Sequence, residues 1–223
     1  MIGVTLLTML LTFQAPWAMW LVRKVWAPFV LFVLGVKVKV KGLEHINPRG
    51  NYIFISNHTS NLDIPILLAT IPRTFYFIAK RELIRVPLFG QIMWLLGMIF
   101  IDRSNPRRSL RSMKLAAIKL KNGKNVLVFP EGTFDNDGHF LPFKKGTFHI
   151  AVKAKMPLLP LAISGASDIW PGGKMLSMKP GEVTINFGPA FEQEDSNDLN
   201  AITNLRDKGE AEVKRLLNEL KKI

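Results

Sequence analysis

The sequence predicts an α/β fold: a central, mostly parallel sheet flanked by helices, behind an N-terminal apolar two-helix segment that anchors the chain to a membrane. Three observations predict it. Short apolar runs recur along the chain, amphipathic stretches lie between several of them, and no charged residue precedes Arg23. We expect two parts, a membrane-interfacial or membrane-embedded helical segment at residues 1–35 and one folded domain at residues 36–223.

The N-terminal segment consists of two uncharged runs on either side of Arg23 and Lys24. A spanning helix needs about 20 apolar residues, so the run at 1–22 is long enough to cross a bilayer, whereas the run at 25–36 is too short. Pro16 interrupts the longer run. Tryptophans surround the two cations, and Trp, Lys and Arg all favour the headgroup level of a membrane: Trp17, Trp20 and Trp26.

We therefore predict two apolar helices in one leaflet, with the aromatic and basic band at the interface. A single true span and a pair of buried core helices are the alternatives. A cleaved signal peptide fits less well, because no basic region precedes the apolar run and no clear small-residue cleavage site follows it.

The elements of the folded domain follow in order. The alternating run Val36 to Lys41 predicts an edge strand with one solvated face. Apolar runs predict buried strands at 52–56, 75–79, 98–101, 126–129, 158–163 and 183–187. Between them we expect helices at 62–71, 83–96, 106–121 and 144–155, and a last helix that opens at Asn197 or Asp198.

Charge is concentrated in the first part of the chain. The formal net charge is +13, and residues 1–124 hold 18 Lys and Arg against 4 Asp and Glu. Such a surface suits acidic lipid headgroups, a phosphorylated substrate or nucleic acid. The aromatic residues are mostly Phe inside apolar runs, which argues against a nucleic-acid stacking platform, and the absence of Cys excludes disulfides.

A histidine and an aspartate five residues apart, His58 and Asp63, fall between a predicted strand and a predicted helix. Within a regular helix their side chains would point about 140° apart. They can touch if His58 lies on the loop that leaves the strand and Asp63 lies in the first helical turn. Asp63 would then fix the imidazole tautomer, leaving a general base. A satisfied structural histidine is the alternative.

The sequence offers no enzyme nucleophile to accompany this base. It lacks Cys and a Gly-x-Ser-x-Gly elbow, and it also lacks phosphate-binding glycine loops and any His, Asp and Glu set with metal-ligand spacing. We expect neither a metal nor a cofactor. A substrate hydroxyl, activated directly by His58, would be the attacking group, without a covalent enzyme intermediate.

Two further strand ends carry candidate substrate contacts. Arg103 follows the strand at 98–101, and its guanidinium fork would match a phosphate. Glu131 could hydrogen-bond a polyol hydroxyl, and Gly132 lets backbone approach closely, with N–H groups that could face an oxyanion. A surface ion pair for Arg103 and an ordinary tight turn at 130–133 are the alternatives.

Together these motifs resemble the glycerolipid acyltransferases, specifically the 1-acylglycerol-3-phosphate acyltransferases. The family's Asn-His-x-x-x-x-Asp block matches Asn57, His58 and Asp63, and its Phe-Pro-Glu-Gly-Thr block matches Phe129 to Thr133. The remaining blocks look like Ala79 to Leu83, Val86 to Gly90 and Gly97 to Arg103, followed by Met156 to Ala162. The resemblance covers roughly residues 37 to 190.

The resemblance implies an acyltransferase domain at 36–223 that transfers a fatty acyl group to the 2-hydroxyl of lysophosphatidic acid, giving phosphatidic acid. His58 would be the general base and Asp63 its partner, with Arg103, Glu131, Gly132 and Thr133 at the substrate. The donor would be acyl-CoA or acyl carrier protein, the acyl chain would run along residues 83–96, and anionic membrane lipids would hold the protein at the cytoplasmic face of the inner or plasma membrane.

One position departs from the family pattern. The family usually carries Arg after Phe-Pro-Glu-Gly-Thr, where this chain has Phe134. Arg103 would then rely on Lys80, Lys144 or Lys145, or the acceptor is another lysophospholipid or glycerol 3-phosphate. A basic protein that binds lipid or nucleic acid without catalysis is the alternative of another class.

Overall fold

A seven-stranded sheet forms the centre of the molecule, in the order β1-β7-β6-β2-β5-β3-β4. The computed structural model describes residues 15–102, 105–121, 124–133, 135, 138–171, 177–192 and 199–221. The strands are β1 (Val36–Lys41), β2 (Ile53–Ser56), β3 (Phe75–Lys80), β4 (Ile99–Ile101), β5 (Asn125–Val128), β6 (Leu158–Ser164) and β7 (Gly181–Phe187).

Most of the sheet is parallel. Strands β6, β2, β5, β3 and β4 run in one direction, β7 is antiparallel to β6, and β1 pairs parallel with β7. The predicted α/β class with a central, mostly parallel sheet is therefore confirmed, and β1 is the edge strand that its alternating sequence indicated. Since parallel strands end at the same edge of a sheet, the loops after β2 and β5 lie side by side.

Helices cover both faces of the sheet. They are α2 (Ala15–Leu21), α3 (Ala27–Val33), α4 (Asp63–Thr70), α5 (Phe89–Leu95), α6 (Pro106–Lys121), α7 (Gly146–Ala154), α8 (Ala166–Ile169) and α9 (Leu199–Lys221). A π-helical stretch, η1 (Val22–Trp26), joins α2 to α3, and short 3₁₀ turns lie at η2 (Leu43–His45) and η3 (Arg81–Arg85).

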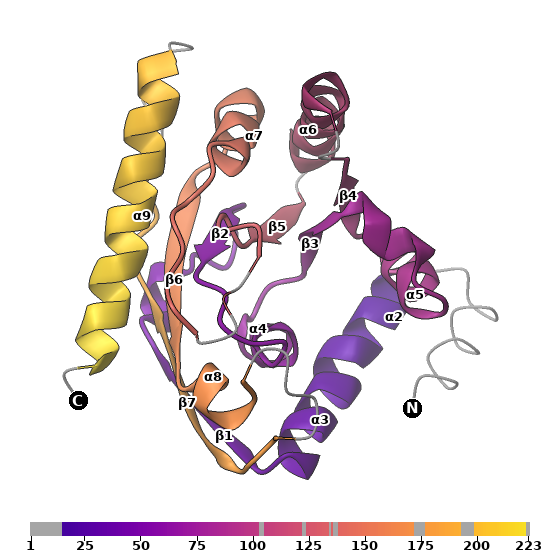
Figure 1. Cartoon of the computed structure of the whole chain (residues 1–223), viewed down its shortest axis with the longest axis vertical. Helices are drawn as coiled ribbons and strands as arrows, with labels where there is room; N and C mark the ends of the chain where they lie inside the picture. Colours follow the sequence, from indigo (N-terminus) through magenta and orange to yellow (C-terminus); the bar gives the residue numbers. More distant parts are fainter. Residues whose placement is uncertain are drawn as a thin grey trace.

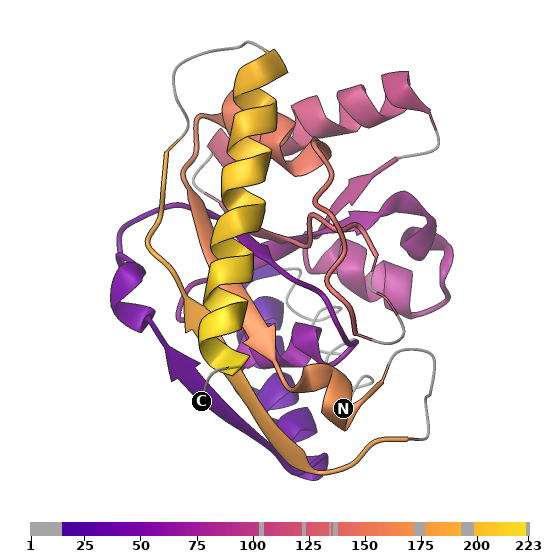
Figure 2. The ribbon, with the colours of Figure 1, turned by 60° about the vertical axis from the view of Figure 1, so that its left-hand side comes forward.

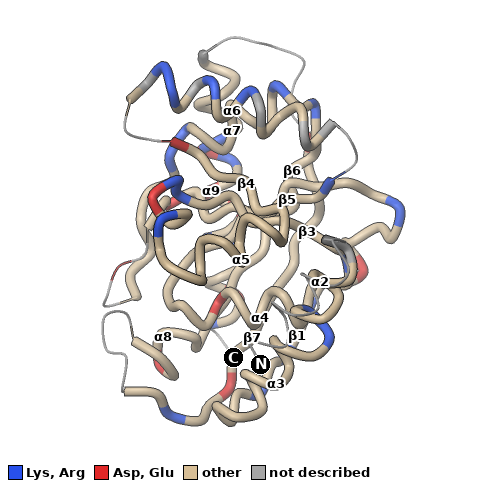
Figure 3. The backbone as a smooth tube through the Cα atoms, turned by 90° about the vertical axis from the view of Figure 1, so that its right-hand side faces the viewer, with Lys and Arg blue, Asp and Glu red and all other residues tan. Residues whose placement is uncertain are grey.

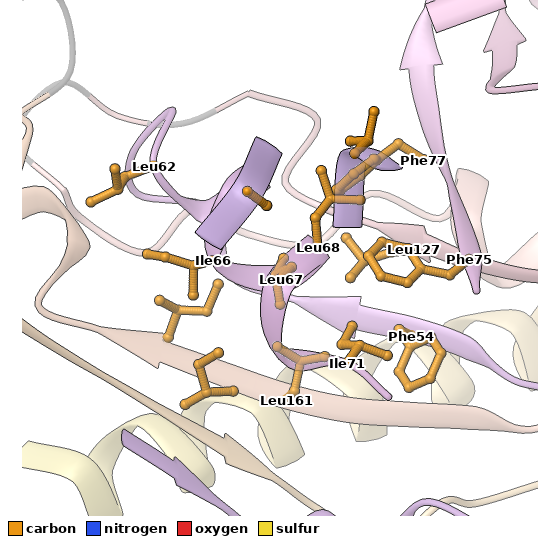
Figure 4. Packing of buried hydrophobic residues seen from close by; sticks show 14 of the residues in the cluster. Phe54, Leu62, Ile66, Leu67, Leu68, Ile71, Phe75, Phe77, Leu127 and Leu161 are labelled. Atoms are coloured by element: carbon orange, nitrogen blue, oxygen red, sulfur yellow. The ribbon is translucent and has the colours of Figure 1, made fainter. Parts of the chain in front are cut away.

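Strand periodicity separates the core into two layers. Phe54 and Leu127 point to the layer that holds α2, α3 and α4, whereas Ile53, Ile55 and Val126 point to the layer that holds α6, α7 and α9. Figure 1 shows these two sets of helices on opposite sides of the sheet, and Figure 2 shows α9 crossing the strands. Figure 4 shows α4 packed on the sheet through Ile66, Leu67 and Ile71.

One predicted element is wrong. We predicted one helix at 83–96, but the chain forms η3, then a tight turn at Val86 to Leu88, then the short helix α5. Pro87 explains the break, because proline disfavours helical geometry at the residue before it and supplies no N–H. The other predicted helices and strands are present with ends shifted by a few residues, and the predicted start of the last helix lies outside the described residues.

The N-terminal segment packs against the sheet domain along one side. From Ala15 to Val33 it is helical throughout, with Ala18, Met19 and Leu31 buried in the layer of α4. The opposite side exposes large apolar side chains: Trp17, Trp20, Val25, Phe29, Phe32 and Val33. Among the described helices none is both long enough and apolar enough to span a bilayer.

Arg23 lies elsewhere than the sequence predicted. Instead of reaching the headgroup level, its side chain is buried and donates to the main-chain oxygens of Leu68 and Ile71 and to the Thr74 hydroxyl. These carbonyls end α4, where a cation satisfies acceptors that have no helical partner. Arg23 therefore fastens the N-terminal helices to the helix that begins at Asp63.

Candidate active site

The candidate site lies where the loops after β2 and β5 meet. Asn57, at the start of the loop after β2, fixes this loop to the neighbouring strand β6. Its side-chain amide takes the place of a main-chain group and extends the hydrogen bonding between β2 and β6. The Asn57 amide donates to the Ile163 oxygen at 2.9 Å and accepts from the Ile163 N–H at 2.8 Å. Both bonds are buried, so the residue before His58 is held by main-chain groups of the neighbouring strand.

Asp63 holds the loop at residues 58–60 and orients the His58 ring. Its Oδ2 accepts from His58 Nδ1 at 2.8 Å, from the Thr59 N–H at 2.8 Å and from the Ser60 N–H at 3.0 Å. Asp63 is the first residue of α4, where the helix dipole favours a negative charge. The predicted contact of His58 with Asp63 is present, and it requires the strand-to-helix turn that the spacing indicated.

The tautomer of His58 follows from this geometry. A buried carboxylate only accepts, so Nδ1 carries the hydrogen and Nε2 carries the lone pair. The imidazole stacks on Phe129, with ring centroids 3.9 Å apart and planes 13° apart, and the Phe129 ring is in turn stacked with Phe77 at a centroid distance of 6.1 Å. Asp63 and Phe129 therefore set the ring orientation, and the His58 side chain is 13% exposed.

Glu131 joins two loops beneath the histidine. Its carboxylate is 1% exposed, and it accepts from the His58 N–H at 2.8 Å through Oε1 and from the Leu141 N–H at 2.8 Å through Oε2. Burial raises the pKa of Glu131 to about 7, although the two N–H donors favour its ionised form. Glu131 thus positions the main chain of the base, and contact with a substrate hydroxyl stays a prediction.

The turn after β5 explains the glycine in this segment. Gly132 has φ of +77°, which a side chain would strain, and its N–H donates to the Phe129 oxygen at 3.0 Å. Thr133 beside it is exposed. Lys80, at the end of β3, is exposed on the same edge of the sheet. Roles for these three residues in substrate binding stay predictions.

Arg103, which we predicted to bind the phosphate, lies outside the described residues, and so does Phe134, the position that departs from the family pattern. Asp102, which precedes Arg103, is buried and pairs with Arg81 at 2.9 Å and with Arg108 at 3.8 Å. The end of β4 is therefore basic even without Arg103. In the described part of the chain, no group of three or more His, Asp and Glu side chains is placed to hold a metal ion.

A largely apolar cavity of about 220 Å³ opens beside the site. Phe129, which stacks on His58, forms part of its wall, together with side chains from β3, β4, α6 and α7. Lys144 and Ser109 supply polar groups at this cavity. No described residue of 83–96 lines it, in contrast to the predicted path of an acyl chain.

Comparison with known proteins identifies the family. The acyltransferase family model matches residues 37–164, which is more than half of the chain and includes the His58 and Glu131 loops. This chain belongs to the acyltransferase family. The family assignment agrees with the resemblance drawn from the sequence motifs alone.

Two relatives carry the name 1-acyl-sn-glycerol-3-phosphate acyltransferase. A 1-acyl-sn-glycerol-3-phosphate acyltransferase of Limnanthes douglasii is 36% identical over 168 residues, which cover 74% of this chain and 58% of the relative. The alpha enzyme of that name in Mus musculus is 35% identical over 164 residues, 73% of this chain and 58% of the relative. The chain thus spans less than two thirds of these relatives.

A solved structure matches over more of its length. The crystal structure of PlsC, the 1-acyl-sn-glycerophosphate acyltransferase of Thermotoga maritima, has a TM-score of 0.80 and 31% identity. The match covers 98% of this chain and 88% of that one. The mixed sheet with its flanking helices is therefore a fold that this acyltransferase also adopts.

Three features of the site were not found from the sequence. These are the stacking of His58 on Phe129, the use of Asn57 to extend the sheet, and the hold of Glu131 on the Leu141 N–H. Phe129 and Asn57 belong to the motifs that carried the family resemblance. The sequence therefore indicated that these two residues lie in the site, but it did not indicate what they contact. Leu141 carries no sequence signal, because only its main chain takes part.

Proposed function

We propose that the protein transfers a fatty acyl group from an acyl thioester to the 2-hydroxyl of 1-acylglycerol 3-phosphate, giving phosphatidic acid. The observation that carries the proposal is the buried Asp63 on Nδ1 of His58, which makes Nε2 the basic nitrogen at a site edged with cations. The family assignment and the similarity to relatives named 1-acyl-sn-glycerol-3-phosphate acyltransferase support the choice of acceptor.

The reaction needs one base and no acyl-enzyme. Nε2 of His58 takes the proton of the acceptor hydroxyl as its oxygen attacks the thioester carbonyl carbon, and Asp63 stabilises the imidazolium that forms. The C–S bond then breaks as the tetrahedral intermediate collapses, and the imidazolium returns the proton to the leaving thiolate. The products are the ester and a free thiol.

Different residues around His58 would bind different parts of the two substrates. The apolar cavity beside Phe129 suits an acyl chain, with its thioester end at His58. Arg103, Lys80 and the exposed Lys144 would bind the acceptor phosphate, with Glu131, Gly132 and Thr133 shaping that side of the site. The donor would be acyl-CoA or acyl carrier protein.

We also propose that the protein works at a membrane, on the cytoplasmic face. The exposed side of α2 and α3 would lie in the interface of one leaflet, held by its tryptophans and by anionic lipids. Because one side of this segment packs on the sheet domain, the bilayer would lie at a fixed distance from the catalytic loops.

A direct assay tests the reaction. Purified protein is incubated with lysophosphatidic acid and with acyl-CoA or acyl carrier protein, and free thiol and phosphatidic acid are measured. Lysophosphatidylcholine and glycerol 3-phosphate serve as competing acceptors, because Phe134 stands where the family usually has an arginine. Thiol release with one of these acceptors alone would move the assignment to that acceptor.

A further inference from the structure

Large apolar side chains cluster on the outer side of the segment between β3 and β4. Five of them within ten residues are 38% to 63% exposed, and together we call them the outer α5 surface: Val86, Leu88, Phe89, Trp94 and Leu95. Single exposed apolar residues are ordinary, whereas a contiguous group marks a surface that meets another phase or molecule.

The inner side of the same segment is built to fix this surface in place. Gly90 is buried, and any side chain there would collide with the main-chain oxygens of Leu83 and Ile84. Ile92 and Met93 pack against the core layer that contains α4. The segment therefore presents an ordered apolar outer side, with its packing needs already met on the inner side.

Leu88 has a strained backbone conformation although its apolar side chain faces water. Its φ is +64°, a region that branched side chains rarely adopt, and its side chain is 62% exposed at the turn before α5. Glycine or asparagine would adopt this turn with less strain and would be better hydrated. A leucine at this position would be favoured over glycine or asparagine if a partner covers its side chain and removes it from water.

The charges beside the surface indicate which partner. Lys80, Arg81 and Arg85 precede it, and within residues 80–95 only Glu82 is acidic. Arg81 also pairs with Asp102, yet its side chain remains 63% exposed. Cations next to exposed Leu, Phe and Trp match the headgroups and outer acyl region of an anionic bilayer.

The surface lies close to the catalytic loops. The chain enters η3 from the carboxyl end of β3, the edge of the sheet at which the His58 and Glu131 loops also lie. Phe77 of β3 stacks on Phe129, which stacks on His58. Figures 1 and 3 place α5 on the same side of the molecule as α2, whose Trp17 and Trp20 are exposed.

We propose that the outer α5 surface is a second contact with an anionic bilayer, separate from the N-terminal helices and adjacent to the catalytic loops. A bilayer held at both places would bring a lipid acceptor to the edge where His58 lies. The proposal rests on the proposed function only in placing the protein at a membrane, so its test reads membrane contact and not turnover.

Tryptophan fluorescence tests the contact directly. The chain has 5 tryptophans, so a variant that keeps Trp94 alone, with Phe at the other four positions, reports on this surface. We expect vesicles of phosphatidylglycerol and brominated phosphatidylcholine to quench Trp94 and shift its emission to shorter wavelength. The control carries W94F and I118W in the same background; Ile118 is 58% exposed on α6 and should remain unquenched. Vesicle-bound protein with unquenched Trp94, or equal quenching at both positions, would overturn the proposal.

Substitution at the turn gives a second test. Leu88→Gly removes the apolar side chain and relieves the backbone strain, so we expect equal or higher resistance to urea but about tenfold weaker sedimentation with the same vesicles. Leu88→Glu should weaken binding further, whereas Ile118→Glu should not. Unchanged vesicle binding of both Leu88 variants would contradict the proposal. So would conversion of a dimer to a monomer without loss of vesicle binding, which would assign the surface to a second copy of the chain.

Discussion

At the scale of single residues, the account depends on how Asp63 sets the state of His58. One carboxylate oxygen holds the imidazole and two main-chain N–H groups, so charge and geometry are provided by the same atom. The stacking of His58 on Phe129 restricts the ring further. The role of Asp63 can therefore be tested by a substitution that removes its charge and keeps the shape of its side chain.

Asp63→Asn is such a substitution. The asparagine oxygen can still accept from Thr59 and Ser60, but it no longer stabilises the imidazolium, so we expect kcat to fall by about 10³ to 10⁴-fold with little change in fold. Steady-state kinetics and circular dichroism measure the two effects. Asp168→Asn, at an exposed position on α8, is the matched control and should leave kcat unchanged. A similar kcat for both variants would remove Asp63 from the mechanism.

Glu131 should make the stability of the fold depend on pH. Its pKa in the folded protein is raised from 4.5 to about 7, so the folded state binds more protons than the unfolded state between these values. This group therefore stabilises the fold less as pH rises from about 4.5 to about 7. Glu131→Gln removes that contribution, and the stability lost on substitution should be larger at pH 5 than at pH 8.

Urea unfolding of the wild type and of Glu131→Gln at both pH values measures the difference. The same measurement on Glu44→Gln, at an exposed position of η2, provides the control. If the loss for Glu131→Gln is the same at pH 5 and pH 8, burial does not shift this carboxyl as described.

At the scale of elements, α4 connects the site to the N-terminal helices. Its first residue is Asp63, and its last carbonyls accept from Arg23. The eight-residue helix is thus held at one end by the catalytic loop and at the other by the segment that we place on the membrane. Loss of Arg23 should loosen this connection.

Arg23→Met should lower the free energy of unfolding by about 2 to 4 kcal/mol, because it leaves buried carbonyls of Leu68 and Ile71 without their donor. Lys24→Met, one residue away and exposed, should change it by only about 0.5 kcal/mol. Urea unfolding gives both values. Equal effects at the two positions would mean that Arg23 does not hold α4.

The elements also show what the sequence could and could not predict. The alternation of Val36 to Lys41 and the apolar runs at β2 and β6 predict strands correctly, because burial has a simple period in a sheet. The break at Pro87 was missed because the apolar residues around it also fit a helix. Arg23 was misplaced because hydropathy does not tell which side of a helix meets a protein and which meets lipid.

Prediction of the site had a similar limit. The spacing of His58 and Asp63 indicated their contact, because two side chains and a turn determine it. The role of Glu131 was not predicted in this form, since its partners are main-chain N–H groups of His58 and Leu141. Such partners depend on where loops meet in space, and residue type carries no information about that.

At the scale of the whole molecule, the distribution of charge accompanies that of exposed apolar surface. Residues 1–124 carry all of the excess of cations, since residues 125–223 hold 12 Lys and Arg against 13 Asp and Glu, and they also include the exposed apolar sides of α2, α3 and α5. The helices α2, α3 and α5 carry no charged residue themselves, and the cations lie on the adjoining η1 and η3 and on α6, where Figure 3 shows several Lys and Arg. Such a surface combines hydrophobic contact with attraction to anionic lipid.

Membrane binding should therefore depend on both salt and lipid. We expect the protein to bind phosphatidylglycerol vesicles more tightly than phosphatidylcholine vesicles, and we expect this difference to shrink as NaCl is raised, because the Debye length falls from about 10 Å at 0.1 M to about 3 Å at 1 M. Vesicle sedimentation measures it. Binding that ignores lipid charge at low salt would contradict a role for the basic surface.

Thiol release from an acyl thioester in the presence of lysophosphatidic acid measures whether His58 activates an acceptor hydroxyl for acyl transfer. We expect thiol and phosphatidic acid in equal amounts from the wild type and a rate about 10² to 10⁴-fold lower from a folded His58→Ala variant. His45→Ala, an exposed histidine on η2, should match the wild type. Undiminished release from His58→Ala would contradict the account.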